Sequence, residues 1–154
     1  MGKSITISRL TRRNFIELID SLSIEQLNEI PVGLNNNIAW NFGHIIVTQQ
    51  ILCYLLAGLT PKMDQALVAK YRKGARPDEL IDLNEINILK SLAYSLLDEL
   101  ENDIKTDIFS NYKPYTTSYG FELTSIADAV DFYSIHESMH YGVALTIKKL
   151  IKQS

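Results

Sequence analysis

The chain has 154 residues, of which 46% are hydrophobic and 21% charged, and its formal net charge is −3 with histidine neutral. This composition is typical of a globular protein and excludes wholesale disorder, and the length predicts a single domain over residues 1–154. The modest negative charge gives no attraction to a phosphate backbone, so we expect no nucleic-acid partner.

The four prolines fall between stretches of helical period and divide the chain into four helical regions, which predicts an all-α fold. The first helix is expected over residues 8–21, with an apolar face made of Leu10, Phe15, Leu18, Ile19 and Leu22. Ser23 and Gln26 form the pattern of a capping box and predict a short helix that ends before Pro31. The next long helix begins at the asparagines of residues 35–37 and ends near Gly58.

Residues 61–77 are expected to form a loop with a short helical turn, and they contain the basic residues Lys70, Arg72, Lys73 and Arg76. The third long helix begins near Asp82, which caps it together with Glu85, and its buried seam is Ile86, Leu89, Ala93, Leu96 and Leu100. A loop or short hairpin follows over residues 109–121. Its aromatic side chains either line a pocket or cap the bundle: Tyr112, Tyr115, Tyr119 and Phe121. The fourth long helix begins at Thr124 or Ser125 and continues nearly to the C-terminus.

Residues 38–59 contain no Asp, Glu, Lys or Arg and are long enough to cross a bilayer. Polar side chains interrupt this segment at Asn41, His44, Thr48, Gln49 and Gln50. A central helix of a bundle, apolar nearly all round, explains the segment better than a membrane span does. We therefore expect no membrane association.

All three histidines of the chain fall on predicted buried seams. The seam of the fourth helix alternates steps of three and four: Ile126, Ala129, Tyr133, His136, His140, Val143, Ile147 and Leu150. Residues four apart lie on the same side of a helix, about 6 Å apart along its axis, so His136 and His140 can converge on one ion. His44, on the seam of the second long helix, would complete a three-nitrogen site with one open position. Hydrogen-bonded core histidines are the alternative interpretation, since the sequence does not show that His44 faces the pair.

Residues 136–140 also match H-E-x-x-H, the helix signature of zinc metalloproteases. The 14 residues after His140 contain no His, Asp or Glu, so the usual third protease ligand is missing. A di-iron bundle site needs a second E-x-x-H motif, and Asn41 stands where its carboxylate would be. Glu137 is a base beside the metal or, as helix geometry favours, a solvated residue at the rim.

Residues 37–45 (NIAWNFGHI) resemble the second-helix signature of DinB-like proteins, and residues 136–142 (HESMHYG) resemble their C-terminal histidine pair. The loop of residues 71–74 and the order of segments agree, so the resemblance covers most of the chain. It implies a four-helix bundle with a long crossover connection. It also implies a homodimer and one divalent metal ion, nickel or zinc, on His44, His136 and His140. The relatives with known activity include low-molecular-weight thiol S-transferases and a thiol-dependent isomerase, and many other relatives have no assigned substrate.

These features predict a metal-dependent enzyme of the thiol S-transferase or hydrolase type that acts on a small molecule such as a low-molecular-weight thiol. A thiol at the open metal position would lose its proton there, and the basic residues 70–76 would hold its carboxylates or simply face solvent. Because imidazole binds metal in its neutral form, we expect the metal affinity to fall as the pH drops through about 6.5.

Two other functions fit the same residues. The first is a non-catalytic, metal- or ligand-binding stress-response module, and the second is a structural bundle whose histidines are hydrogen-bonded. Cys53 is the one cysteine and lies in an apolar helix, where we expect an inert thiol. With no visible leader segment, the lone cysteine predicts a cytoplasmic protein.

Overall fold

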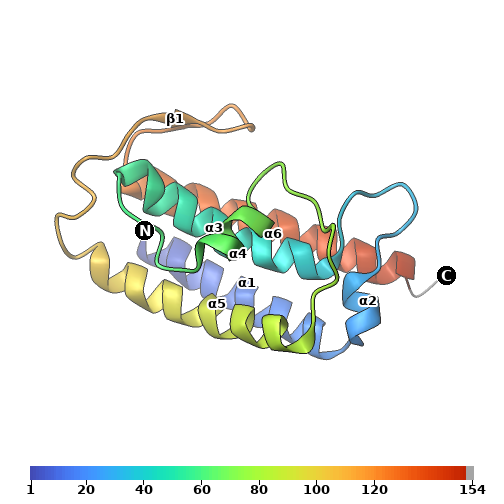
Figure 1. Ribbon diagram of the computed structural model, residues 1–154. Coiled ribbons are helices and arrows are strands. Elements are labelled where there is room, and N and C mark those ends of the chain that lie inside the picture. Colours follow the sequence, from blue (N-terminus) through green and yellow to red (C-terminus); the bar gives the residue numbers. More distant parts are fainter. Residues whose placement is uncertain (152–154) are drawn as a thin grey trace.

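The computed structural model describes residues 1–151 and consists mainly of helices (Figure 1). The four long helices are α1 (Gly2–Asp20), α3 (Ile38–Cys53), α5 (Leu83–Asp103) and α6 (Ile126–Ile151). The short ones are α2 (Ile24–Asn28), the 3₁₀ turn η1 (Leu55–Ala57) and α4 (Gln65–Tyr71). Two short strands, β1 (Tyr115–Thr116) and β2 (Glu122–Leu123), pair in antiparallel fashion as a hairpin.

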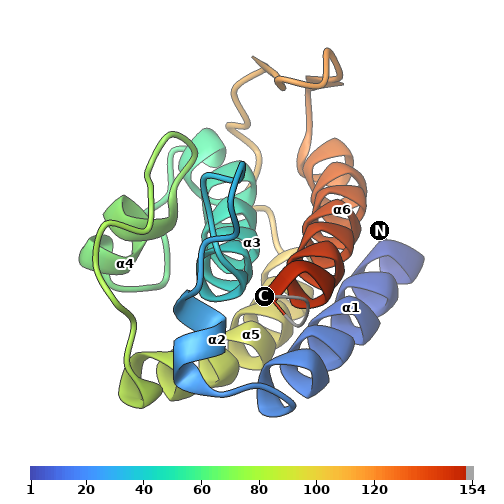
Figure 2. The same cartoon turned by 90° about the vertical axis from the view of Figure 1, so that its right-hand side faces the viewer.

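The long helices form a four-helix bundle in which α6 packs against α1 and α3, and α5 packs against the same two helices. The consecutive long helices α1 and α3 therefore lie at opposite corners of the bundle (Figure 2). Such diagonal order needs long connections, and residues 21–37 carry α2 while residues 104–125 carry the hairpin. The predicted bundle with a long crossover is confirmed. Within residues 1–151, no helix combines the length and hydropathy needed to cross a bilayer.

Side-chain caps fix where three of the helices begin, as their sequences predict. Ser23 and Gln26 form the reciprocal capping box of α2, with the Gln26 amide 3.3 Å from Ser23 Oγ. Asn37 Oδ1 accepts a hydrogen bond from the Trp40 amide at the start of α3, at 2.8 Å. Asp82 caps α5 in the same way. Each cap satisfies a backbone amide that has no partner inside its helix.

The first helix differs from its prediction in length and in the residues that it buries. It begins at Gly2 rather than near residue 8, and Leu10 is 45% exposed although it was expected on the apolar face. The buried stripe instead includes Arg12, which is fully buried. The buried residues recur in steps of three and four: Ile5, Ser8, Arg12, Phe15 and Ile19. The sequence pattern did not reveal this face because one of its members, Arg12, is charged.

The buried face of α6 includes the predicted seam residues Ala129, Tyr133 and Ile147 but departs from the seam at two positions. Val143 and Leu150 are each 40% exposed, and the neighbouring Ala144 and Ile151 are buried in their place. A straight α-helix has 3.6 residues per turn, so a strict heptad pattern rotates by about 20° per heptad relative to it. Ile147 stays buried as predicted, so the rotation shifts the core-facing position by one residue only at Val143 and Leu150. It also turns Glu137 into the core.

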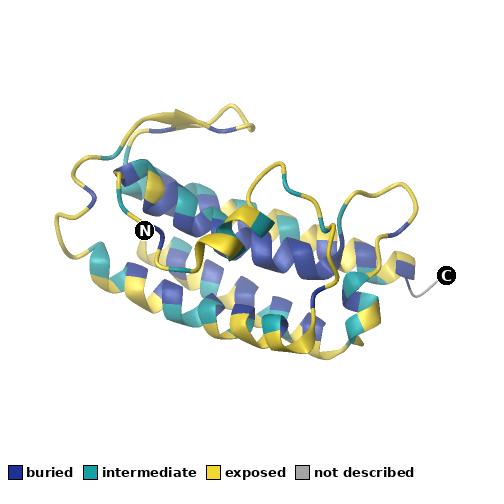
Figure 3. Cartoon of the chain, viewed as in Figure 1, coloured by how far each residue is buried: buried dark blue, intermediate teal, exposed yellow. Residues whose placement is uncertain are grey.

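Helix α3 is covered by α6 and α5 within the bundle and by α4 outside it, and Figure 3 colours nearly all of it as buried. All of its residues are buried except Thr48 and Ile51. This placement confirms that the uncharged segment is a central bundle helix, and it makes α3 a rigid support for His44.

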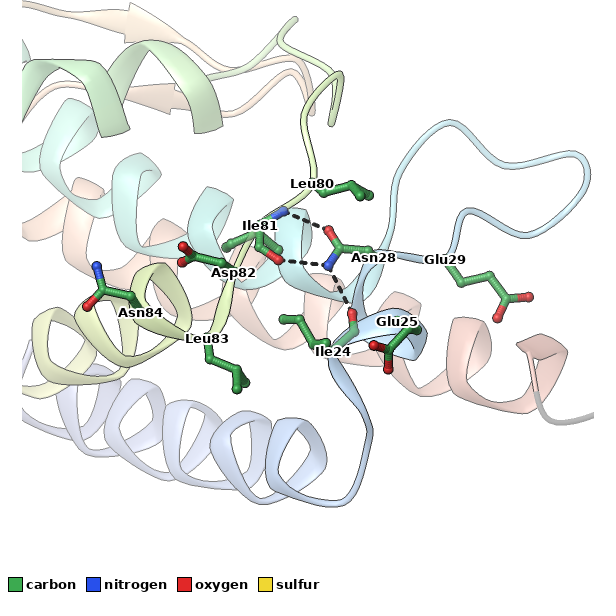
Figure 4. Close-up of a pocket in the computed structure, with 9 residues that line it drawn as sticks. All are labelled: Ile24, Glu25, Asn28, Glu29, Leu80, Ile81, Asp82, Leu83 and Asn84. Carbon is green, nitrogen blue, oxygen red and sulfur yellow. Dashed lines mark hydrogen bonds between the residues drawn. The ribbon is translucent and has the colours of Figure 1, made fainter.

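A groove of about 890 Å³ separates α2 from the segment that leads into α5 (Figure 4). Asn28 ties its two sides together, since its side-chain amide donates to the Ile24 and Ile81 carbonyls and its Oδ1 accepts from the Ile81 amide, each at 2.9 Å. These hydrogen bonds satisfy the Asn28 side chain and leave it no donor for a ligand. Glu25, Glu29 and Asp82 line the groove, but within residues 1–151 their oxygens do not gather into a cluster that could hold a metal ion.

Candidate metal centre

The three histidines converge from two neighbouring helices, His44 from α3 and the other two from α6. Each offers one ring nitrogen, and these nitrogens all lie within 4.8 Å of one another. The Nε2 atoms of His136 and His140 are 3.1 Å apart. The sequence left open whether His44 faces the pair, and the packing of α3 on α6 places it there.

Hydrogen bonds on the far side of two rings determine which nitrogen points into the cluster. His44 Nδ1 donates to the backbone carbonyl of Tyr71 at 2.7 Å, and His140 Nδ1 donates to Asn41 Oδ1 at 2.7 Å. The Tyr71 carbonyl can only accept, so His44 Nδ1 carries the proton and its Nε2 keeps a lone pair, with the Thr48 hydroxyl 3.4 Å away. For His140 we assign the Asn41 oxygen toward the ring, which gives the same tautomer. Supporting hydrogen bonds of this kind are typical of metal-binding histidines.

The environment keeps all three imidazoles neutral at neutral pH. Burial, followed by the charge of nearby His44, lowers the pKa of His136 to about 4. Burial, followed by the charges of the other two histidines, lowers the pKa of His140 to about 3. Burial also lowers the pKa of His44, against the opposing effect of its hydrogen bond to Tyr71. Neutral imidazole is the form that binds metal, so protons compete only at a pH well below the value near 6.5 expected from the sequence.

The lack of a side chain at Gly43 on α3 makes room for the ring of Tyr71, the residue whose carbonyl orients His44. A Cβ atom added at Gly43 would lie 2.4–2.6 Å from three carbons of the Tyr71 ring, so only glycine lets that ring pack here. The Tyr71 hydroxyl donates to Glu85 Oε1 at 2.6 Å, which anchors the other end of the side chain. Gly43 and Glu85 therefore fix Tyr71, and its carbonyl in turn fixes His44.

The nitrogens of the three histidines open onto a cavity of about 340 Å³ between α3, α6 and the two loops. Thr48 and Ile51, the two residues of α3 that are not buried, both line it. The other lining residues are Leu52, Leu56, Lys73, Tyr115, Thr117, Ser118 and Phe132. The arrangement offers three nitrogen donors on one wall of a largely apolar cavity large enough for a small molecule.

The residues of the two loops divide between the cavity and other roles. Of the four basic residues 70, 72, 73 and 76, only Lys73 lines the cavity, and Lys70 instead forms an ion pair with Glu85 at 2.8 Å. Among the aromatic residues of the hairpin segment, Tyr115 lines the cavity. Tyr112 donates to the Leu52 carbonyl at 2.9 Å, while Tyr119 and Phe121 are at least half exposed. Sequence patterns alone did not separate these roles.

Glu137 is not the solvated rim residue that helix geometry favoured. It is fully buried and pairs with Arg12, whose Nε lies 3.1 Å from Glu137 Oε1. Arg12 also donates to the Ala93 carbonyl at 2.8 Å and to Gln49 Oε1 at 3.3 Å. Glu137 does not line the cavity, so the pair joins α1 to α6 within the core. The sequence does contain a sign of this ion pair, because Arg12 is spaced three or four residues from the buried residues Ser8 and Phe15 of α1.

The donor set fits one divalent ion of the first transition series. Two nitrogens bound to one tetrahedral zinc ion lie about 3.3 Å apart, close to the separation of His136 and His140 Nε2. Two of the three rings already have the outer hydrogen bonds that hold a ligand, whereas Nδ1 of His136 is buried without a partner within residues 1–151. Three imidazoles suit zinc, nickel, copper or iron better than magnesium or calcium.

Comparison with known proteins gave one family. A protein-family model described as the DinB superfamily matches residues 8–144, which include all three histidines. The search of curated proteins found no match.

Proposed function

We propose that this chain, which belongs to the DinB superfamily, holds one nickel or zinc ion on His44, His136 and His140 and uses it on a small-molecule substrate. The family membership confirms the resemblance of residues 37–45 and 136–142. The observation that supports the proposal most strongly is the convergence of three neutral imidazoles on one wall of a cavity. Two of these rings are already oriented by outer hydrogen bonds.

The chemistry of the cavity favours thiol S-transfer over hydrolysis. A divalent ion on three nitrogens supplies a Lewis acid and lowers the pKa of a thiol or water that reaches its open position. Within the described residues, no Asp or Glu lines the cavity, so the chain offers no carboxylate as general base. A thiol ionises far more readily than water does and needs such a base less. The apolar side chains of Ile51, Leu52, Leu56 and Phe132 keep bulk water from the reacting groups.

The second candidate function is a module that holds a metal or ligand without turnover. The lack of a carboxylate in the lining of the cavity favours this module, because a site that only binds does not need a general base. Both candidates predict ligand exchange at the metal, and only the first predicts catalysis.

We test the two candidates with protein loaded with zinc or nickel. The assay follows conjugation of cysteine and mercaptoethanol to monobromobimane by fluorescence, with His140→Ala as the control. A rate above the uncatalysed reaction that is lost in the control supports the transferase. Thiol binding without acceleration for any acceptor supports the binding module. No metal uptake would overturn the transferase and the metal-holding form of the binding module.

The proposal includes a homodimer and no nucleic-acid or membrane partner. On α6, Ile135, Met139 and Val143 lie four residues apart and are 59%, 46% and 40% exposed, which provides an apolar stripe for a second copy. Sedimentation of the purified protein at several concentrations tests the oligomeric state.

A further inference from the structure

We propose that Lys73 makes the cavity selective for small anionic ligands, above all thiols that carry a carboxylate. This inference rests on the proposed function and adds a substrate class to it. Lys73 is the one lysine or arginine among the described residues that line the cavity, and no Asp or Glu is among them. The charged side chain that lines the cavity is therefore positive, although the net charge of the whole chain is −3.

The loop places Lys73 at the cavity through the same contacts that orient His44. Tyr71, two residues earlier, is held by the space at Gly43 and by its hydrogen bond to Glu85. The backbone then leaves α4 in an extended conformation at Arg72 and turns at Gly74, which has φ of +89°. Because a left-handed backbone favours glycine, the turn after Lys73 is encoded locally. The backbone that carries the Lys73 ammonium is therefore fixed on one side by Tyr71 and on the other by the turn at Gly74.

Lys73 is also available to a ligand, unlike Lys70 in the same segment. It forms no hydrogen bond or ion pair within residues 1–151. Lys70 is neutralised by Glu85 at 2.8 Å. Arg76 lines a separate cavity together with Glu79 and Glu85. A lysine without a partner at the edge of an apolar cavity offers three donors to an entering anion.

The other residues that line the cavity define the rest of the ligand. The apolar side chains of Ile51, Leu52 and Phe132 suit a short hydrocarbon segment. The hydroxyls of Thr48, Thr117 and Ser118 offer additional hydrogen bonds. The volume of about 340 Å³ lies near the lower end of the roughly 300–1,000 Å³ of small-molecule sites. The ligand that fits is a small molecule that carries both a thiol and an anionic group.

The test measures dissociation constants for three thiols of similar length and different charge. They are mercaptopropionate, mercaptoethanol and cysteamine, which are anionic, neutral and cationic apart from the thiol. Cobalt-loaded protein reports binding through its visible absorption. Each thiol is compared between the unmodified protein and Lys73→Met, so intrinsic differences between the thiols cancel. Arg72→Met is the matched control, because Arg72 lies in the same loop and does not line the cavity.

We expect Lys73→Met to weaken mercaptopropionate about fivefold, a value reduced for solvent screening of an exposed lysine. Mercaptoethanol should bind both proteins equally, and cysteamine should bind the variant more tightly. Arg72→Met should leave all three constants unchanged. Equal effects of Lys73→Met on the three thiols, or none, would overturn the role of Lys73 while leaving the metal site intact. Failure to bind cobalt or any thiol would instead overturn the proposed function as well.

Discussion

Replacing Arg12 with methionine should destabilise the protein severely. Arg12 and Glu137 are both fully buried, and their pairing is the main compensation for the carboxylate, since Glu137 Oε2 already has no partner within the described residues. Removing one member of a buried ion pair costs about 3–5 kcal/mol, because the remaining charge stays buried. The Ala93 carbonyl and Gln49 Oε1 also lose a donor. We therefore expect a loss of about 3–5 kcal/mol, out of a total of roughly 5–15 kcal/mol for a typical domain.

Equilibrium unfolding in urea, followed by circular dichroism, measures this loss. The double variant Arg12→Met/Glu137→Leu is the informative control, since it removes the buried carboxylate together with its partner. Apolar replacement of a whole buried pair is often neutral, so the double variant should be more stable than Arg12→Met alone. A loss below about 1 kcal/mol for Arg12→Met, or additive losses in the double variant, would refute the reasoning.

Three further predictions concern the histidines and the cysteine. Gly43→Ala should displace the Tyr71 ring and loosen the hydrogen bond to His44, lowering zinc affinity about tenfold in calorimetric titration; unchanged affinity would contradict the role of Gly43. The metal-free protein should lose stability as the pH falls from about 6.5 toward 4, because the unfolded chain binds protons there that His136 and His140 do not bind when folded, and their pKa values are about 4 and about 3. Urea unfolding across this range checks the slope, which should weaken in His136→Ala/His140→Ala. Burial raises the pKa of the Cys53 thiol, so iodoacetamide should modify it only in denaturant; rapid modification of the folded protein would show that Cys53 is accessible.

The sequence predicts the helices and the place of each histidine on a buried stripe because both depend on local periods and caps, whereas the convergence of His44 on the pair depends on the packing of α3 on α6. The α5 seam from Ile86 to Leu100 is buried as expected, and Asp82 caps its helix through the Glu85 amide. The histidines were found because each lies on a stripe that must face another helix. These features need only the geometry of one helix at a time.

The errors arise where the environment of a residue depends on a distant part of the chain. Arg12 and Glu137 are 125 residues apart, and a charged residue looks solvated until its partner is known. The heptad pattern was wrong at Val143 because an α-helix has 3.6 residues per turn, so a seven-residue repeat does not stay on one face.

The loops around the cavity were also beyond sequence patterns. The Tyr71 carbonyl that orients His44 is a backbone atom and leaves no trace in residue type. Lys73 could not be separated from its basic neighbours until the loop was placed against α3. Loop conformations depend on tertiary contacts, and this loop depends on the packing of the Tyr71 ring in the space that Gly43 leaves open.

Metal stoichiometry tests the central claim most directly. Tag-free protein is stripped with a chelator, reloaded with zinc or nickel, desalted and assayed by elemental analysis, alongside His44→Ala and His140→Ala. We predict close to one ion per chain in the unmodified protein and loss of that ion in both variants, with the helical circular dichroism preserved. No retained metal, or the same amount in the variants, would contradict the assignment of His44, His136 and His140 as the metal centre.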